Sequence, residues 1–323
     1  MNVKVSMDSG VQRLNDLRGL MAVWIVLGHL ALSMDVQKNL FLILQKGNLA
    51  IVGLFFFLSG YGLEKSLEKK PDYLKTFLFK KISRLLLMTW VQFGVTELCF
   101  LLLRFHRDYN GLRGVLREYA LGVNWYMWEL ALMYLIFFVS HLLFVGRKAY
   151  FAAVLLCAAL LAGLYGMLGA YAATYSCAAF PAGMIIYAAK QKLEKAAESR
   201  YGEMFIALLI LTGISAYSMV MPKDIFISAA GKNVFCVFFV MLTSLIFLKL
   251  DVNTSAFKFL SRMSPEIYLY QFPAASVATI IAARRGGGPR GLTYAAAAFA
   301  LTMLLALIVY VLRKTAEKMI DEN

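Results

Sequence analysis

Long apolar runs separated by short polar segments dominate the chain. A membrane-spanning helix needs about 20 mostly apolar residues. The hydrophobic pattern predicts about ten such helices, at residues 17–34, 48–63, 85–103, 125–145, 149–168, 171–189, 204–221, 233–250, 266–283 and 292–312. Residues 1–16 are polar and no small-residue cleavage site follows the first run, so this run is not expected to be a cleaved signal. The predicted fold is all-α, a polytopic transmembrane bundle that forms a single integral-membrane domain over residues 1–323.

Composition supports the same fold class. Of the 323 residues, 61% are hydrophobic and 16% are charged. Soluble domains average about 45–50% apolar and about 25% charged residues, and a bilayer provides the apolar solvent that the excess requires. Membrane lipid is therefore an expected partner.

The net charge of +14 arises mainly from Lys and Arg residues in the loops. Most basic residues lie between apolar runs, as topology signals do, so nucleic acid is not an expected partner. With the N-terminus inside, cytoplasmic segments hold about two thirds of the 33 Lys and Arg residues, and the loop 64–84 contributes most. Both termini are therefore predicted to be cytoplasmic. The four cysteines fall within apolar runs, so we expect packing thiols and neither a disulfide framework nor a metal site.

The first predicted helix carries two ionisable residues, Arg18 and His29. Eleven residues at about 100° each complete three turns plus about 20°, so both side chains share one helix face. His29 lies roughly 16 Å deeper than Arg18, near the middle of the bilayer if Arg18 is at the cytoplasmic rim. Arg18 alone is also explained as a topology anchor and His29 as a structural residue. Together they suggest a path from the cytoplasm to a reactive centre.

A second basic cluster enters the third predicted helix. Lys81 and Arg84 are three residues apart and are expected to share a helix face, with Lys80 beside them. One interpretation is a cytoplasmic flank of a membrane helix. The other is that these cations bind the phosphates of a cytoplasmic donor.

Five segments carry a family resemblance. They are RLNDLRGLMAVWIVLGH at 13–29, FFFLSGYGL at 55–63, the Lys81–Arg84 pair, NWYMWELALMY at 124–134 and SPEIYLYQFP at 264–273. The chain resembles the acyltransferase 3 family of membrane acyltransferases along nearly its whole length. The first two segments are specific when they occur together in this order. Gln271 departs from the family pattern, in which many members carry a second histidine, and Lys81 replaces the usual arginine.

The resemblance implies a donor, acetyl-CoA or another acyl-CoA, bound from the cytoplasm, and an acceptor hydroxyl on a glycan or another surface molecule. His29 would be the general base or acyl relay, because histidine exchanges protons near neutral pH. Arg18, Lys81 and Arg84 would bind the donor. Acceptor-side or supporting roles are expected for Glu129, Gln271, Tyr268 and Ser59, of which Ser59 and Glu129 also fit purely structural roles.

The leading hypothesis is thus an acyltransferase that transfers an acetyl-type group in a cell membrane, expected to be a bacterial plasma membrane. Two alternatives stay open at the level of the sequence. One is an exporter of a modified polysaccharide, and the other is a member that binds donor but has lost turnover, as Gln271 suggests. The acceptor and the oligomeric state are not encoded in any recognisable motif.

Overall fold

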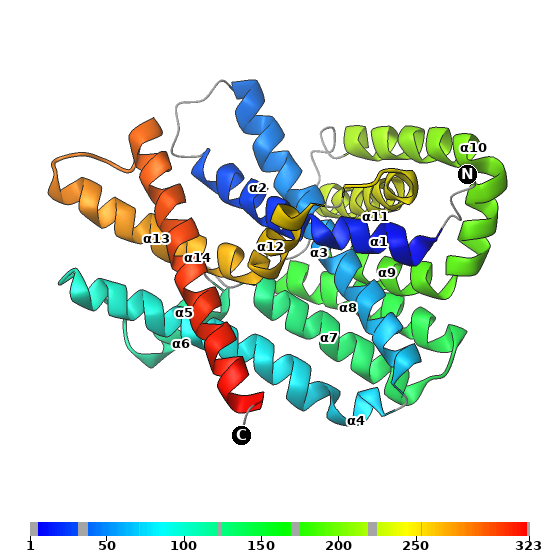
Figure 1. Cartoon of the computed structure of the whole chain (residues 1–323), viewed down its shortest axis with the longest axis horizontal. Coiled ribbons are helices and arrows are strands. Elements are labelled where there is room, and N and C mark those ends of the chain that lie inside the picture. Colours follow the sequence, from blue (N-terminus) through cyan, green and yellow to red (C-terminus); the bar gives the residue numbers. More distant parts are fainter. Residues whose placement is uncertain are drawn as a thin grey trace. The chain divides into compact units, whose positions relative to one another are not determined.

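The computed structural model describes residues 6–31, 38–70, 72–121, 125–168, 175–218, 225–252 and 254–321. Helices account for nearly all of them, and these residues contain no strand. Figure 1 shows the helices in chain order. The all-α prediction is therefore confirmed for the described part of the chain.

The chain divides into two compact units whose segments alternate along the sequence. The first unit comprises Met1–Asn15, Leu49–Leu86 and Tyr126–Val252, and the second comprises Asp16–Asn48, Leu87–Trp125 and Asn253–Asn323. The first unit mainly contains α1 (Met7–Asp16), α4 (Tyr73–Phe77), the π-helical turn η1 (Leu78–Ile82), α7 (Trp125–Leu143), α8 (Arg147–Leu168), α9 (Ala179–Ala188), α10 (Lys190–Ser218) and α11 (Ile225–Lys249). The second mainly contains α2 (Arg18–Leu30), α6 (Leu112–Leu121), α12 (Ser255–Arg262), α13 (Ser264–Arg284) and α14 (Leu292–Asp321). Two helices, α3 (Lys38–Lys69) and α5 (Ser83–Leu102), contribute to both units.

Every predicted apolar segment overlaps a helix in the described part of the chain, although the boundaries differ. Of the segment predicted at 171–189, only Ala179–Ala188 is helical, residues 175–178 are not, and residues 171–174 lie outside the described part. Among the described residues, five stretches are long and apolar enough to cross a bilayer: Gly47–Lys69, Leu78–Leu102, Trp125–Leu143, Ala229–Lys249 and Leu292–Met319. These spans make the chain a multi-pass membrane protein. Ten spans, cytoplasmic termini and a single domain over the whole chain stay predictions.

Two boundaries correct the predicted ones. The helix predicted at 48–63 runs over Lys38–Lys69, because the flanks are rich in Lys, Leu and Glu, which are all good helix formers whether polar or apolar. The segment predicted at 17–34 is helical only over Arg18–Leu30, with residues 32–34 outside the described part. With 13 residues, α2 is about 20 Å long and shorter than the hydrocarbon core of about 30 Å.

The polar helix α1 is bound to the first unit by side-chain contacts. Tyr61 Oη donates to Asp8 Oδ1 at 2.9 Å, and Lys65 Nζ lies 2.9 Å from the same oxygen. Burial works to raise the pKa of Asp8, but the hydrogen bonds from Lys65 and Tyr61 and the charge of Lys65 outweigh it and lower that pKa. At its other end, Arg13 donates to the carbonyl oxygens of Phe247 and Leu248, each at 3.2 Å.

Close helix packing in the first unit depends on two glycines. A Cβ atom on Gly60 of α3 would overlap the carbonyl oxygen of Phe180 of α9. The reverse holds for Gly183 of α9, whose Cβ would overlap the carbonyl oxygen of Phe57. The two backbones therefore approach each other as small residues allow in membrane helices. Gly62, two residues further along α3, has no neighbouring atom in that direction.

We predict that Gly60→Ala destabilises the protein by about 1–3 kcal/mol, because rigid backbone atoms must move to accept the methyl group. Gly62→Ala is the matched control, and it should leave stability unchanged or raise it slightly because alanine favours helix. Thermal unfolding of the detergent-solubilised variants measures both effects. Equal stability of the two variants would show that α3 and α9 do not pack as described.

Candidate active site

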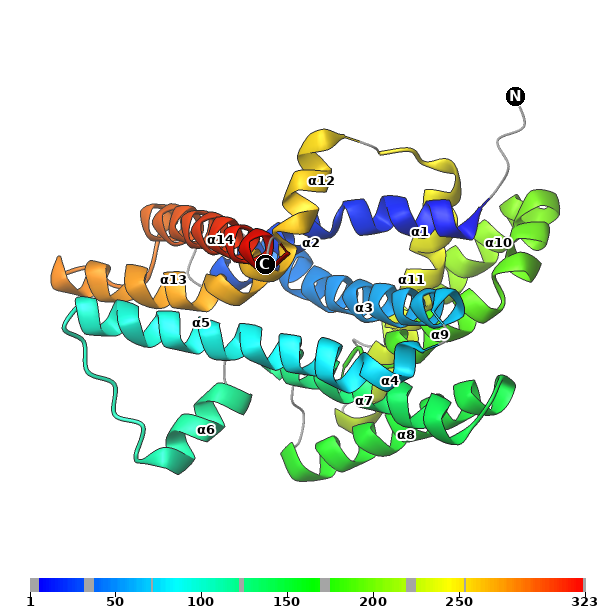
Figure 2. The ribbon, with the colours of Figure 1, turned by 60° about the horizontal axis from the view of Figure 1, so that its bottom comes forward.

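The site begins with the way α2 packs inside the second unit. This helix packs against α12, α13 and α14, and α13 and α14 lie side by side in Figures 1 and 2. A Cβ atom on Gly19 would overlap backbone atoms of Leu260 in α12, so glycine permits this approach at the start of α2. The packing fixes both ends of the helix whose first residue is Arg18 and whose penultimate residue is His29.

His29 and Gln271 meet within this unit. The two residues are 242 positions apart, and Nδ1 of His29 lies 2.8 Å from Oε1 of Gln271. Gln271 is buried in α13, whereas His29 is half-buried. The ring of Phe272 lies against the imidazole with 5.1 Å between ring centroids. The residue that departs from the family pattern is thus the hydrogen-bond partner of the predicted catalytic histidine.

The amide of Gln271 determines which imidazole nitrogen carries the proton. Its Nε2 donates to the carbonyl oxygen of Tyr268 at 2.9 Å, and a carbonyl oxygen can only accept. Oε1 must therefore face His29, and Nδ1 of His29 must donate to it. In the neutral ring Nε2 then carries the lone pair. This nitrogen is the one available to take a proton from a substrate.

Asn48 adds a polar group that the sequence did not reveal. Its side chain lies against Gly28, where a Cβ atom would overlap the Asn48 amide. The buried Oδ1 of Asn48 has no hydrogen-bond partner among the described residues. Asn48 lies at the edge of a long apolar run, and nothing in its local sequence distinguishes it from a helix-end residue.

An ion pair holds α13, the helix that carries Gln271. Nε of Arg313 in α14 lies 2.6 Å from Oε1 of Glu266, which is 1% exposed. A second contact joins Nη1 of the same arginine to Glu317 at 3.0 Å. A buried carboxylate requires such a partner, because an unpaired charge in apolar surroundings is strongly unfavourable. The pair fixes the start of α13 one and a half turns before Gln271.

The other candidate residues belong to the first unit. Lys80 and Lys81 lie in the π-helical turn η1, and Arg84 lies in the first turn of α5. Lys81 and Arg84 were predicted to share a helix face on the assumption of about 100° of rotation per residue. That assumption does not hold between them, because a π-helical turn rotates by a smaller angle per residue than an α-helix. All three cations are exposed. Their proximity to Arg18 or His29 stays a prediction.

Glu129 of α7 is buried at 2% exposure, and neither carboxylate oxygen has a hydrogen-bond partner among the described residues. A supporting role of Glu129 in the site stays a prediction. Ser59 is half-buried on α3, one residue before the packing contact of Gly60. Tyr268 is buried and contributes its backbone carbonyl to the site.

The two remaining histidines, His106 and His141, have different surroundings. His106 is exposed. His141 is a structural hydrogen-bonding residue, with Nε2 at 2.7 Å from Oε1 of the buried Glu64. The four cysteines are free, and three of them are buried. In the described part of the chain, no three His, Cys, Asp or Glu side chains are placed to hold a metal ion.

Long apolar helices and a histidine oriented by a buried amide define a class of protein: a multi-pass membrane protein with a polar centre among its helices. The model of the family described as an acyltransferase domain matches residues 11–311, which is most of the chain. The chain therefore belongs to the acyltransferase 3 family, and it is a membrane acyltransferase. Comparisons with curated proteins and with solved structures gave no match.

We predict that Gln271→Leu changes the tautomer of His29. Without an acceptor for Nδ1–H, the neutral ring should no longer favour the form with the proton on Nδ1. Imidazole ¹⁵N NMR of labelled protein measures this change directly, and the exposed His106 serves as an internal reference. Gln191→Leu, at an exposed glutamine, is the control substitution. An unchanged His29 spectrum in Gln271→Leu would contradict the assigned hydrogen bond.

Proposed function

We propose that this protein transfers an acetyl-type group from a cytoplasmic acyl-CoA to a hydroxyl of a glycan or another cell-surface acceptor, with His29 as the general base. The observation that carries the proposal is the hydrogen bond between His29 Nδ1 and Gln271 Oε1. It orients the imidazole and leaves Nε2 as a proton acceptor. Family membership supplies the reaction class.

The proposed reaction follows from the tautomer of His29 that carries its proton on Nδ1. Nε2 of His29 accepts the proton of the acceptor hydroxyl while the hydroxyl oxygen attacks the thioester carbonyl. The carbon–sulfur bond breaks as the new ester forms, and the proton passes from His29 to the departing thiolate. No net charge is left on the imidazole, so the enzyme is ready for the next turnover.

Donor binding is proposed for Arg18, Lys81 and Arg84. Arg18 begins α2, eleven residues and about three turns before His29, so a donor bound at Arg18 would lie along the helix that carries the base. Lys81 and Arg84 are exposed, and Lys81 lies in a π-helical turn, a feature often found at functional sites, with Arg84 just after it. Guanidinium and ammonium groups suit the phosphates of a coenzyme.

On the acceptor side, the structure favours a supporting role for Gln271 over direct contact with the acceptor, because both polar atoms of its amide already have partners. Two other side chains retain oxygens without partners among the described residues, Glu129 and Asn48. Either can accept hydrogen bonds from sugar hydroxyls. We propose that the protein acts in a bacterial plasma membrane, where a cytoplasmic donor and a surface acceptor meet.

We predict that His29→Ala abolishes esterification of the surface acceptor, with a loss of at least about 100-fold in rate, because the reaction loses its general base. Mass spectrometry of surface polymers from cells that express each variant measures the ester content, and coenzyme release by purified protein measures turnover. His106→Ala is the matched control, since this histidine is exposed. Wild-type ester content in stably expressed His29→Ala would exclude His29 as the base.

We predict that Arg18→Ala raises the KM for acyl-CoA roughly tenfold, because a charge-assisted contact to phosphate is lost. Arg18→Lys should restore part of the affinity, since the charge remains but the forked geometry does not. Arg117→Ala, at an exposed arginine of α6, is the control. A lower kcat with unchanged KM in Arg18→Ala would contradict a donor-binding role.

A further inference from the structure

Two segments of the second unit are rich in arginine. Residues 103–121, which follow α5 and include α6, and residues 284–291, which lead from the end of α13 to α14, hold seven arginines and no lysine, although the whole chain has more lysines than arginines. All seven are exposed: Arg104, Arg107, Arg113, Arg117, Arg284, Arg285 and Arg290. A guanidinium group presents a planar fork that binds a carboxylate or a phosphate through two hydrogen bonds, which an ammonium group cannot do.

The two segments meet where α5 and α13 end. Nη2 of Arg284 donates to the backbone carbonyl oxygen of Leu103, and Figures 1 and 2 both show these two helix ends side by side. Four arginines therefore gather at this end of the second unit, and we call them the arginine surface: Arg104, Arg284, Arg285 and Arg290. The other three lie on the chain that continues from Arg104.

Few negative charges offset these arginines. The two segments contain two acidic residues, Asp108 and Glu118. Glu118 pairs with Arg107 at 2.8 Å, and Asp108 accepts a backbone hydrogen bond within its own turn. Glu97 of the adjoining α5 accepts from the hydroxyl of Tyr109. An anion that approaches the arginine surface therefore meets cations that form no ion pair with a described carboxylate.

Helix ends and membrane topology do not explain so many arginines. The C-terminal end of a helix favours a cation, which accounts for Arg104 after α5 and for Arg284 at the end of α13. It does not account for the other five. In the predicted topology both segments face the outside, where membrane proteins keep few basic residues. Their arginines therefore require another reason, and a negatively charged partner supplies one.

One helix connects the arginine surface with the candidate site. Arg284 is the last residue of α13, and Gln271 lies 13 residues before it, roughly 20 Å along the helix axis. Gln271 in turn is the hydrogen-bond partner of His29. An acceptor that forms a chain can contact the arginine surface and His29 at the same time, whereas a small acceptor cannot.

We propose that the arginine surface binds an acidic glycan chain, with carboxylate or phosphate groups against Arg285 and Arg290 and a hydroxyl further along the chain at His29. This inference rests on the proposed acyl transfer and adds a chemical class to its acceptor. A lipid headgroup fits the surface less well, because residues 286–291 are four glycines, a proline and an arginine, with no large apolar side chain to enter a bilayer.

A binding measurement without any acyl donor tests the proposal. The full-length protein in phosphatidylcholine nanodiscs is titrated with hexagalacturonate as the acidic probe and with maltohexaose as the neutral comparison. Wild type should bind the acidic probe more tightly, and added salt should weaken that binding. Arg285→Gln with Arg290→Gln should weaken it roughly tenfold, because charge-assisted hydrogen bonds are lost. Arg285→Lys with Arg290→Lys should retain part of the affinity, since the charge remains.

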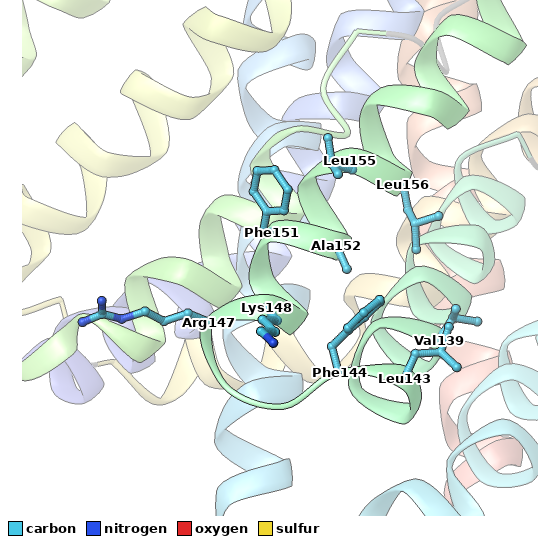
Figure 3. A pocket seen from close by; sticks show the side chains of 9 residues that line it. All are labelled: Val139, Leu143, Phe144, Arg147, Lys148, Phe151, Ala152, Leu155 and Leu156. Carbon is cyan, nitrogen blue, oxygen red and sulfur yellow. The ribbon is translucent and has the colours of Figure 1, made fainter.

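Arg147→Gln with Arg200→Gln is the matched control, because both are exposed arginines of the first unit. Figure 3 shows the side chain of Arg147 extending away from the apolar groove beside it, and this residue lines a hollow that also contains Glu64 and Glu68. The control variant should bind hexagalacturonate as wild type does. His29→Ala should do so too, so a failure of acyl transfer and a failure of glycan binding are detected separately.

Three results would overturn the proposal. The first is equal affinity of wild type for the two hexasaccharides, or wild-type binding by the Gln variant in a form that thermal unfolding shows to be folded. The second is a Gln variant that loses phosphatidylglycerol in native mass spectrometry but keeps hexagalacturonate, which would assign the surface to lipid headgroups. The third is labelling of Arg290→Cys by a membrane-impermeant maleimide only after cell lysis, which would place the surface inside the cell.

Discussion

Polar groups buried among apolar helices need partners, and this constraint organises both units of the structure. In a bilayer the backbone N–H and C=O groups form their hydrogen bonds within each helix. The polar side chains therefore decide which helices meet and at what depth in the membrane they are aligned. Glu64 pairs with His141, Glu266 with Arg313, and His29 with Gln271. The Glu64–His141 and His29–Gln271 contacts join helices far apart in the sequence, and the Glu266–Arg313 pair joins the consecutive helices α13 and α14. Leucine and phenylalanine fill the space around them but do not distinguish one alignment from another.

The helices themselves were predictable because their signal is local. A run of apolar residues that crosses lipid forms a helix, and every predicted run overlaps one in the described part of the chain. Helix ends were less predictable, because α3 continues beyond its apolar run through residues that include polar ones. The π-helical turn around Lys81 was not predictable either, because it depends on how a helix adjusts to its neighbours and not on residue type.

In the candidate site too, features set by local sequence were predictable and features set by distant contacts were not. The spacing of Arg18 and His29 places both on one face of α2, and that argument needs only helix geometry. The partner of His29 lies 242 residues away, and no local pattern pairs them. In the sequence Gln271 indicated a missing second histidine and raised doubt about turnover. In the structure the amide of Gln271 orients the imidazole of His29. Asn48, which no sequence pattern marked as a site residue, lies against Gly28, the residue before His29.

An amide partner differs from a carboxylate in one respect that bears on the chemistry. Both accept a hydrogen bond from Nδ1 and so select the same tautomer, but only a carboxylate offsets the charge of a protonated imidazole. Gln271 orients His29 and stabilises the imidazolium only through this hydrogen bond, without a negative charge to offset it. In apolar surroundings that ion is unfavourable, so a proton taken by Nε2 must soon be passed on. In the proposed transfer from a thioester, the departing thiolate can receive this proton, so proton transfer and carbon–sulfur cleavage would occur in close succession rather than through a long-lived charged intermediate.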